Sequence, residues 1–190
     1  MQMTMNNDRF WDLLESFHPK AEGFCRKLAG NRDDGDDLYQ DSLLHAMHKF
    51  SGLRDEKAFR PWLYRLIINR YRNRVRKPWW RRRETLGAGT PEGGADDPAG
   101  RYDSRRWLER GLKALSPEER ALIVLFELQQ WTVAELAELH GRPPGTIKAR
   151  LSRARLKMRR ALERYLVHQE QTNLSREGAY GLPESETAVE

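Results

Sequence analysis

The residues with the clearest chemical use are a run of cations and small side chains between positions 146 and 159. At about 100° per residue of a helix, Ala149, Ser152 and Arg153 share one face. The cations flanking this face are Lys148, Arg155 and Arg159 on one side, and Arg150 and Lys157 on the other. Small side chains permit close approach to DNA, while arginine can pair with a guanine edge and flanking cations reach phosphates. The pattern predicts a helix that enters the major groove of duplex DNA.

The segment before this run predicts a helix and a tight turn. Thr132 and Glu135 have the spacing of a capping box, and Gly141 suits the left-handed end of a helix. Pro143 and Pro144 cannot continue that helix, but they can open the next one. The arrangement is helix-turn-helix geometry. The alternative for the cationic face is a solvated basic helix that only keeps a bundle in solution, and the turn residues disfavour it.

A second basic segment, at 58–76, reads as a long helix that mixes cations with aromatic rings. Its inward residues are expected to be Trp62, Leu63, Leu66 and Ile67. Its basic surface is expected to contain Arg65, Asn69, Arg70, Arg72, Arg74, Arg76 and Lys77, with Tyr64 and Tyr71 interleaved, and to continue through Trp79, Trp80 and Arg81 to Arg83. Cations that follow phosphates and rings that stack on bases are typical of single-stranded nucleic acid binding.

Acidic and amide side chains form a third candidate site. Asp37, Gln40 and Asp41 lie at i, i+3 and i+4 of a helix expected at 37–50, so they share one exposed stripe. The inward residues of this helix are expected to be Leu38, Leu43, Leu44, Met47 and Phe50, after a turn at 31–36. The stripe has two interpretations: acids that favour a helix N-terminus, or a docking face for a basic partner.

Two other chemistries have weaker support. A magnesium-dependent nuclease could use Asp33, Asp34, Asp36, Asp37 and Asp41, but these acids have no convergent base elsewhere. A zinc site could use Cys25, His18, His45 and His48, but only the last two have close spacing. We expect no catalytic activity, metal or cofactor.

The composition indicates a reducing compartment and a polyanionic partner. With Cys25 as the single cysteine, no intrachain disulfide can form. No apolar stretch is long enough for a membrane span and no signal-peptide pattern occurs, so we expect a cytoplasmic protein without membrane insertion. The net charge is +6, and removing the acidic stretches 84–100 and 168–190 leaves +14 on the remainder.

The expected fold is all-α, with two small helical domains on a tether. The first domain is expected at 8–83, with a flexible acidic linker at 84–101 rich in glycine and proline. The second is expected at 102–167 and includes a helix start at Ser116-Pro117-Glu118-Glu119. Residues 168–190 are expected to be a polar, acidic, disordered tail.

Three of these segments together resemble a known family. They are DDLYQDSLLHAMHKF, AFRPWLYRLIINRYRNRVRK and LSPEERALIVLFELQQWTVAELAELHGRPPGTIKARLSRARLKM. They resemble regions two and four of the extracytoplasmic-function sigma factors of the sigma-70 family. The resemblance implies a non-catalytic bacterial promoter-specificity subunit of RNA polymerase, and it makes an anti-sigma protein a candidate partner. A stand-alone helix-turn-helix regulator is the alternative, because it would use the same recognition helix without a docking stripe.

The resemblance also implies roles for individual residues. Those implied to bind core polymerase, at the clamp helices of its largest subunit, are Asp37, Gln40 and Asp41. Those implied to bind the minus-ten element are Ser51 and Lys57, at the ends of a base-capturing loop, and Tyr64, Arg65, Asn69 and Arg74. Those implied to bind the minus-thirty-five element are Thr146, Lys148, Ala149, Arg150, Ser152 and Arg153. A contact with the flap of the second-largest polymerase subunit is implied as well.

The chain departs from the family pattern at several positions. Many relatives have serine at the position of Ala149, and a larger residue is common at Ser152, so the family's base preference does not transfer. The Pro143-Pro144 and Trp79-Trp80 pairs are also less usual, and the acidic tail lies outside the pattern.

Overall fold

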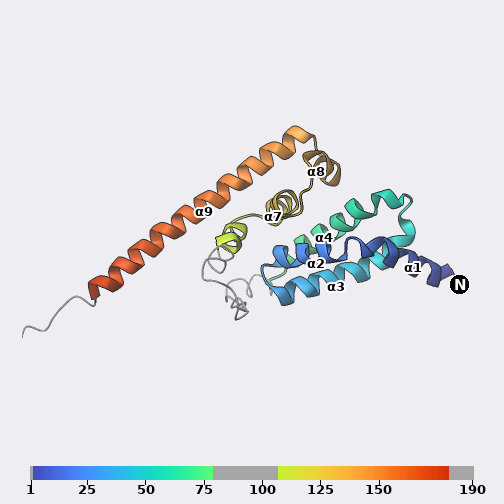
Figure 1. Cartoon of the computed structure of the whole chain (residues 1–190), viewed down its shortest axis with the longest axis horizontal. Helices are drawn as coiled ribbons and strands as arrows, with labels where there is room; N and C mark the ends of the chain where they lie inside the picture. Colours follow the sequence, from blue (N-terminus) through green and yellow to red (C-terminus); the bar gives the residue numbers. More distant parts are fainter. Residues whose placement is uncertain (1, 79–106, 180–190) are drawn as a thin grey trace, which may run out of the picture.

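Helices form the regular structure throughout the residues that the computed structural model describes, which are 2–78 and 107–179 (Figure 1). No strand occurs in these two ranges, so the all-α prediction is confirmed. The N-terminal half contains α1 (Gln2–Glu15), α2 (His18–Ala29), α3 (Arg32–Lys49), the 3-10 turns η1 (Phe50–Gly52) and η2 (Glu56–Ala58), and α4 (Phe59–Val75). The C-terminal half contains a helical segment at 107–113, α7 (Pro117–Ile123), the π-helical turn η3 (Val124–Leu128), α8 (Val133–His140) and α9 (Pro144–Ala179).

The core of the N-terminal half is aromatic where α1, η1 and α4 meet. The ring of Phe10 contacts those of Phe50 and Phe59 edge-on, with centroids 5.4 and 5.6 Å apart. This is the favoured geometry for ring quadrupoles. Helices α2 and α3 cross closely at Gly35, where an added Cβ would lie 2.4 Å from the Cα of Arg26. The absence of a side chain at Gly35 therefore permits this crossing.

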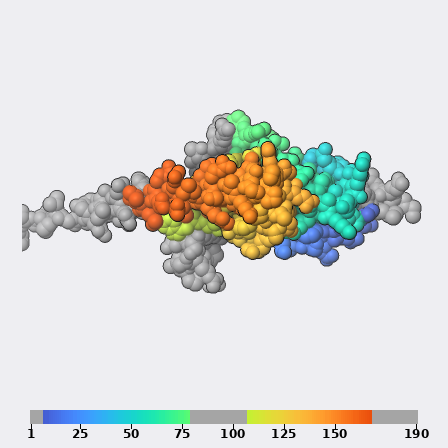
Figure 2. Space-filling view, turned by 90° about the horizontal axis from the view of Figure 1, so that it is seen from above, coloured from blue at the N-terminus to red at the C-terminus, as the bar shows by residue number. Residues whose placement is uncertain are grey.

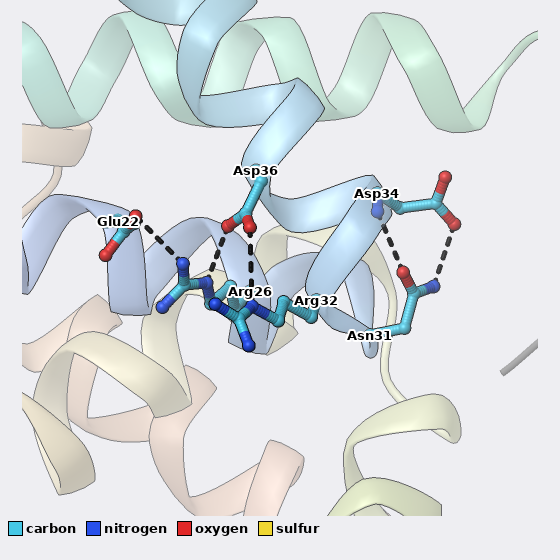
Figure 3. Close-up of polar contacts among 6 residues, drawn as sticks. All are labelled: Glu22, Arg26, Asn31, Arg32, Asp34 and Asp36. Carbon is cyan, nitrogen blue, oxygen red and sulfur yellow. Dashed lines mark hydrogen bonds and ion pairs between the residues drawn. The ribbon is translucent and has the colours of Figure 1, made fainter. Parts of the chain in front are cut away.

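The turn between α2 and α3 differs from the prediction, because α3 begins at Arg32 and the expected turn at 31–36 is mostly helical. The reason is the cap at Asn31, whose Oδ1 accepts the backbone N–H of Asp34 at 2.8 Å (Figure 3). The guanidinium of Arg26 pairs with Glu22 of its own helix at 2.8 Å and with Asp36 of α3 at 2.6 Å, and the second ion pair joins the two helices. Aspartates that suggested a loop thus lie in the first turns of a helix, where their charge is favourable.

The helix caps and helix ends predicted for the C-terminal half are confirmed. Ser116 and Thr132 each form a capping box, with Glu119 and Glu135 respectively. Gly141 has φ 59° and ends α8, and α9 then begins at the second proline. The stripe of α9 opposite the predicted DNA-facing residues is buried at Ile147, Leu151 and Ala154, which anchors the helix on α7 and α8.

Helix α9 is much longer than predicted, and the expected tail at 168–190 is wrong over its first half. The helix runs for 36 residues to Ala179, and its distal part extends away from the other elements (Figure 1). The sequence at 168–179 has no proline, and its glutamines, glutamates and leucine are good helix formers. The polar composition of this stretch therefore does not end the helix. The expected linker at 84–101 lies outside the described residues.

The two halves pack against each other, a contact that a flexible tether alone does not predict. Helix α4 lies along α7 and α8, and Figure 2 shows this seam from above where the yellow-orange and cyan-green surfaces meet. The Tyr64 ring lies 5.0 Å from that of Trp131, and the Arg60 guanidinium lies 4.1 Å from the same indole centroid. Arg60 also donates to Glu135 at 3.0 Å. We call this contact the seam.

Candidate nucleic-acid interface

The predicted recognition face of α9 is open to solvent. Lys148, Ala149, Ser152 and Arg153 are exposed, and Thr146 and Arg150 are half-buried. The Arg153 Nε donates to the carbonyl of Ala149 at 3.3 Å, which directs its stem along the helix surface. A buried apolar stripe thus holds a face of small and cationic side chains outward. This is the arrangement that groove binding requires.

The cations on the flanks of α9 are less free than the sequence suggested. Arg155 pairs with Glu127 of η3 at 2.7 Å and lies 5.2 Å from the Phe126 ring centroid. Lys157 pairs with Glu119 of α7. Burial raises the pKa of Glu119, but hydrogen bonds from Lys157 and Ser116 outweigh it, so the net pKa is lowered. These two cations therefore fix α9 on its own domain.

The residues implied for the minus-ten element lie in two different environments. Ser51 and Lys57 are exposed at the ends of the loop that contains η1 and η2. On α4, Arg65 and Asn69 are exposed, but Arg65 donates to the carbonyls of Leu139 and Glu138, each at 3.1 Å. Those carbonyls belong to the C-terminal turn of α8, whose orphan acceptors Arg65 satisfies.

The two tyrosines of α4 are not on its surface, so their predicted placement is wrong in this arrangement. Tyr64 and Tyr71 are each 1% exposed. Tyr64 packs between Phe24 and Trp131. Burial is the largest influence on its phenol and raises the pKa of that group. Helical periodicity predicts which face of α4 the two tyrosines occupy. It does not predict that α7, α8 and the loop before α8 cover that face. Trp79 and Trp80 lie outside the described residues.

The acidic stripe of α3 is exposed as predicted, at Asp37, Gln40 and Asp41. Leu44 continues this stripe one turn further and is 59% exposed, so its predicted inward orientation is wrong. The side chains of Arg74 and Arg70 on α4 reach the two aspartates, at 3.4 and 3.3 Å.

These exposed ion pairs are weak, and they leave the carboxylates available. Leu44 adds one exposed apolar side chain to the end of the acidic stripe.

The described residues contain no cluster of three or more His, Cys, Asp or Glu side chains suited to a metal. Of the aspartates considered for a nuclease, Asp36 pairs with Arg26 at 2.6 Å and Asp34 accepts a hydrogen bond from the Asn31 amide at 2.8 Å. Cys25 is fully buried, and burial raises the pKa of its thiol strongly. Core packing accounts for this cysteine.

Arg120 of α7 is a functional residue that the sequence analysis missed. It is 5% exposed and joins the two halves, because it donates to the Leu28 carbonyl at 2.8 Å and the Tyr71 hydroxyl at 2.6 Å. Its Nε donates to the carbonyl of Leu112 at 3.0 Å. The one signal in the sequence was that Arg120 lies three and four residues before Ile123 and Val124. This spacing places Arg120 on the same helix face as these two buried residues.

The fold and this face together define a two-domain helical DNA-binding protein with a helix-turn-helix. Family models match both domains: residues 13–81 match sigma-70 region 2, and residues 105–158 match sigma-70 region 4. The chain belongs to the extracytoplasmic-function sigma factors of the sigma-70 family. It is a promoter-directing RNA polymerase sigma factor, and sigma factors are transcription regulators and not enzymes.

Individual relatives agree with this assignment. The chain is 31% identical to the RNA polymerase sigma-E factor of Streptomyces avermitilis, over 73% of this chain and 76% of the relative. It is 28% identical to the ECF RNA polymerase sigma factor SigM of Mycobacterium tuberculosis, over 80% and 76%.

Solved structures agree as well. The sigma factor RpoE of Bartonella quintana, solved in complex with the anti-sigma factor NepR, aligns with TM-score 0.61 and 27% identity, over 82% of this chain and 97% of that one. CnrH, solved in complex with the cytosolic domain of CnrY, shares the fold, with TM-score 0.60 and 24% identity over 85% and 93%. In the described ranges no helix is long and apolar enough to cross a membrane.

Proposed function

We propose that α9 reads duplex DNA of the minus-thirty-five element through the face formed by Lys148, Ala149, Ser152 and Arg153. The observation that carries this proposal is the exposure of that face on a helix whose opposite stripe is buried. Arg153 supplies the donors for a base edge, and the neighbouring cations contact phosphates. Arg150 and Thr146 lie at the margin of the same face.

Core RNA polymerase docks on the exposed stripe of α3. This acidic stripe combines the carboxylates of Asp37 and Asp41 with the amide of Gln40, and Leu44 adds an apolar contact at its end. Acids on this stripe complement a basic partner surface and set the orientation of docking. The anti-sigma factor NepR, bound to the structural neighbour RpoE of Bartonella quintana, supports a similar partner on these polymerase-facing surfaces as part of this proposal.

The minus-ten element is captured by the loop from Ser51 to Lys57 and by α4. Because Tyr64 is buried at the seam and Arg65 binds α8, these two side chains reach unpaired bases only after α8 separates from α4. Extruding a base costs a few kcal/mol, which the contacts of the assembled complex must supply. The linker keeps both domains on one promoter and raises the effective concentration of the second contact. The protein acts in the cytoplasm, where the polymerase is.

Transcription from a promoter library with core polymerase tests the docking assignment. The triple substitution Asp37→Asn, Gln40→Ala, Asp41→Asn should reduce polymerase-dependent transcripts more than tenfold. The double substitution Asp12→Asn, Glu15→Gln is the matched control, because it removes the same charge from two exposed acids of α1, outside the stripe. Full transcription by the triple variant would contradict the assignment, and tight duplex binding without polymerase would favour a stand-alone regulator.

A further inference from the structure

A cleft of about 500 Å³ opens where α4 faces the turn of the helix-turn-helix. Arg65 and Asn69 line it from the N-terminal half. His140 and Arg142, at the turn, and Arg150 of α9 line it from the C-terminal half. Its volume lies in the range of sites that bind small molecules. The two halves of the protein thus build one cavity together.

The cleft carries unbalanced positive charge. Four arginines line it, together with one acid, Glu118, which pairs with Arg72 at 2.9 Å. The guanidinium of Arg65 donates to the carbonyls at the end of α8. The side chains of Arg142 and Arg150 form no ion pair or hydrogen bond within the chain described. Two guanidinium groups therefore face the cleft without an anion.

His140 adds an unused polar atom to the same cleft. Its Nε2 is buried and has no hydrogen-bond partner in the described structure. A buried polar atom without a partner is destabilising, so a ligand that reaches it gains a contact that the described protein atoms do not supply. Such an orphan atom beside two unpaired arginines indicates a binding site for an anion with several oxygens.

A second cleft, of about 380 Å³, continues this one along α9. It shares Glu118, His140 and Arg150 with the first and extends to Arg153 and to Lys157, which pairs with Glu119 in the same lining. The two together form a basic path and not a single point of charge. A linear chain of anionic groups fits such a path better than one isolated phosphate, because arginine forks bind successive phosphate oxygens.

The acidic C-terminal segment of the chain itself is not the occupant. From Arg150 to Ala179, α9 rises about 44 Å at 1.5 Å per residue. The residues after Ala179 span about 40 Å at most when fully extended. Helix α9 spans about 53 Å from Pro144 to Ala179, so while it is helical these residues fall short of Arg142 in the first cleft, and the ligand held there comes from outside this segment.

We propose that the interdomain cleft binds an oligophosphate, held by Arg142 and Arg150 from one domain and Asn69 from the other. The phosphate chain can be free or part of a nucleotide, and the shared chemistry is a row of phosphoryl oxygens. Because the ligand contacts both halves, it binds only when they are packed together, and it stabilises that arrangement. The inference does not depend on promoter recognition, since it requires neither DNA nor polymerase.

Calorimetric titration of the full-length protein with inorganic tripolyphosphate, without magnesium and at fixed ionic strength, tests the proposal. We expect saturable binding of one anion per chain. Arg142→Gln and Asn69→Asp should each weaken it at least fivefold. The matched controls are Arg160→Gln, which removes the same charge from the exposed face of α9, and Asn73→Asp, which adds the same charge one turn further along α4. They should change affinity less than twofold.

Three results would overturn the proposal: no saturable binding, equal loss in the controls, or insensitivity to Asn69→Asp. The last would place the anion on one domain alone. A parallel titration with a nucleoside triphosphate distinguishes the sources. Equal affinity means that the phosphate chain alone is bound, and tighter binding means that the base and sugar are bound too; both support the site.

Discussion

Arg153 is the residue through which α9 is expected to discriminate between sequences. A bidentate arginine contributes about 1–3 kcal/mol at the base pair that it contacts. Arg153→Ala should therefore reduce affinity about five- to 150-fold for the preferred promoter and much less for one altered at that base pair. Binding of holoenzyme to a set of upstream sequences measures this difference. Equal loss on every sequence would instead identify Arg153 as a phosphate contact.

His140 makes the stability of the protein depend on pH. Burial lowers its pKa, as do Arg150 and Arg65, while Glu118 acts in the opposite direction. A histidine whose pKa is lower in the folded state contributes stability above its unfolded pKa, about 6.5, and loses it as the pH falls toward the folded value. The urea midpoint should therefore be lower at pH 5.5 than at pH 7.5.

His140→Gln separates this contribution from the others. The variant should show a smaller difference in midpoint between the two pH values. His45, whose pKa is also lowered, by burial and by Arg70 and Lys49, accounts for part of the remainder, so His45→Gln is measured beside it. An unchanged pH dependence in His140→Gln would show that His140 does not titrate differently in the two states.

The close crossing of α2 and α3 at Gly35 gives a prediction for these two helices. Gly35→Ala places a methyl group 2.4 Å from the backbone Cα of Arg26, which a side-chain rotation cannot relieve, so α2 and α3 must move apart. Overpacking of this kind costs about 1–3 kcal/mol of folding free energy. Gly23→Ala in α2 meets nothing within 4 Å and should stabilise by about 0.5–1 kcal/mol. Urea unfolding of the two variants tests whether steric contact, and not helix propensity, decides if a Gly→Ala substitution lowers or raises the free energy of unfolding.

Elements whose limits depend on local chemistry could be predicted from the sequence. The caps at Ser116 and Thr132 and the stop at Gly141 each involve a few neighbouring residues, and all three are where the pattern placed them. The errors concern what covers a face. Periodicity separates the two sides of α3 and α4. It does not predict that no other element packs over Leu44 or that the C-terminal half buries Tyr64. The roles of the site residues in binding remain predictions for the same reason.

The seam could not be predicted, because it is a property of the whole molecule. Its contacts join residues far apart in the sequence, such as Arg65 with Leu139, 74 positions apart, and Tyr71 with Arg120, 49 positions apart. Neither motif encodes the other motif's position. The seam covers Tyr64 and occupies Arg65, which are the side chains proposed to hold unpaired bases. A protein that opens promoters must therefore break these contacts during assembly with polymerase.

A covalent link across the seam tests this requirement. The ion pair Arg60–Glu135 crosses the seam, so cysteines at both positions can be joined by a short bismaleimide, and buried Cys25 is shielded from the reagent. We expect the linked protein to retain core polymerase binding, since the stripe of α3 stays exposed. It should lose promoter opening more than tenfold, measured as permanganate-reactive thymines. The control links Arg26 and Asp36, an ion pair between α2 and α3 within the N-terminal half, by the same chemistry and should open promoters normally. Normal opening by the seam-linked protein would show that α4 holds melted DNA without leaving α8.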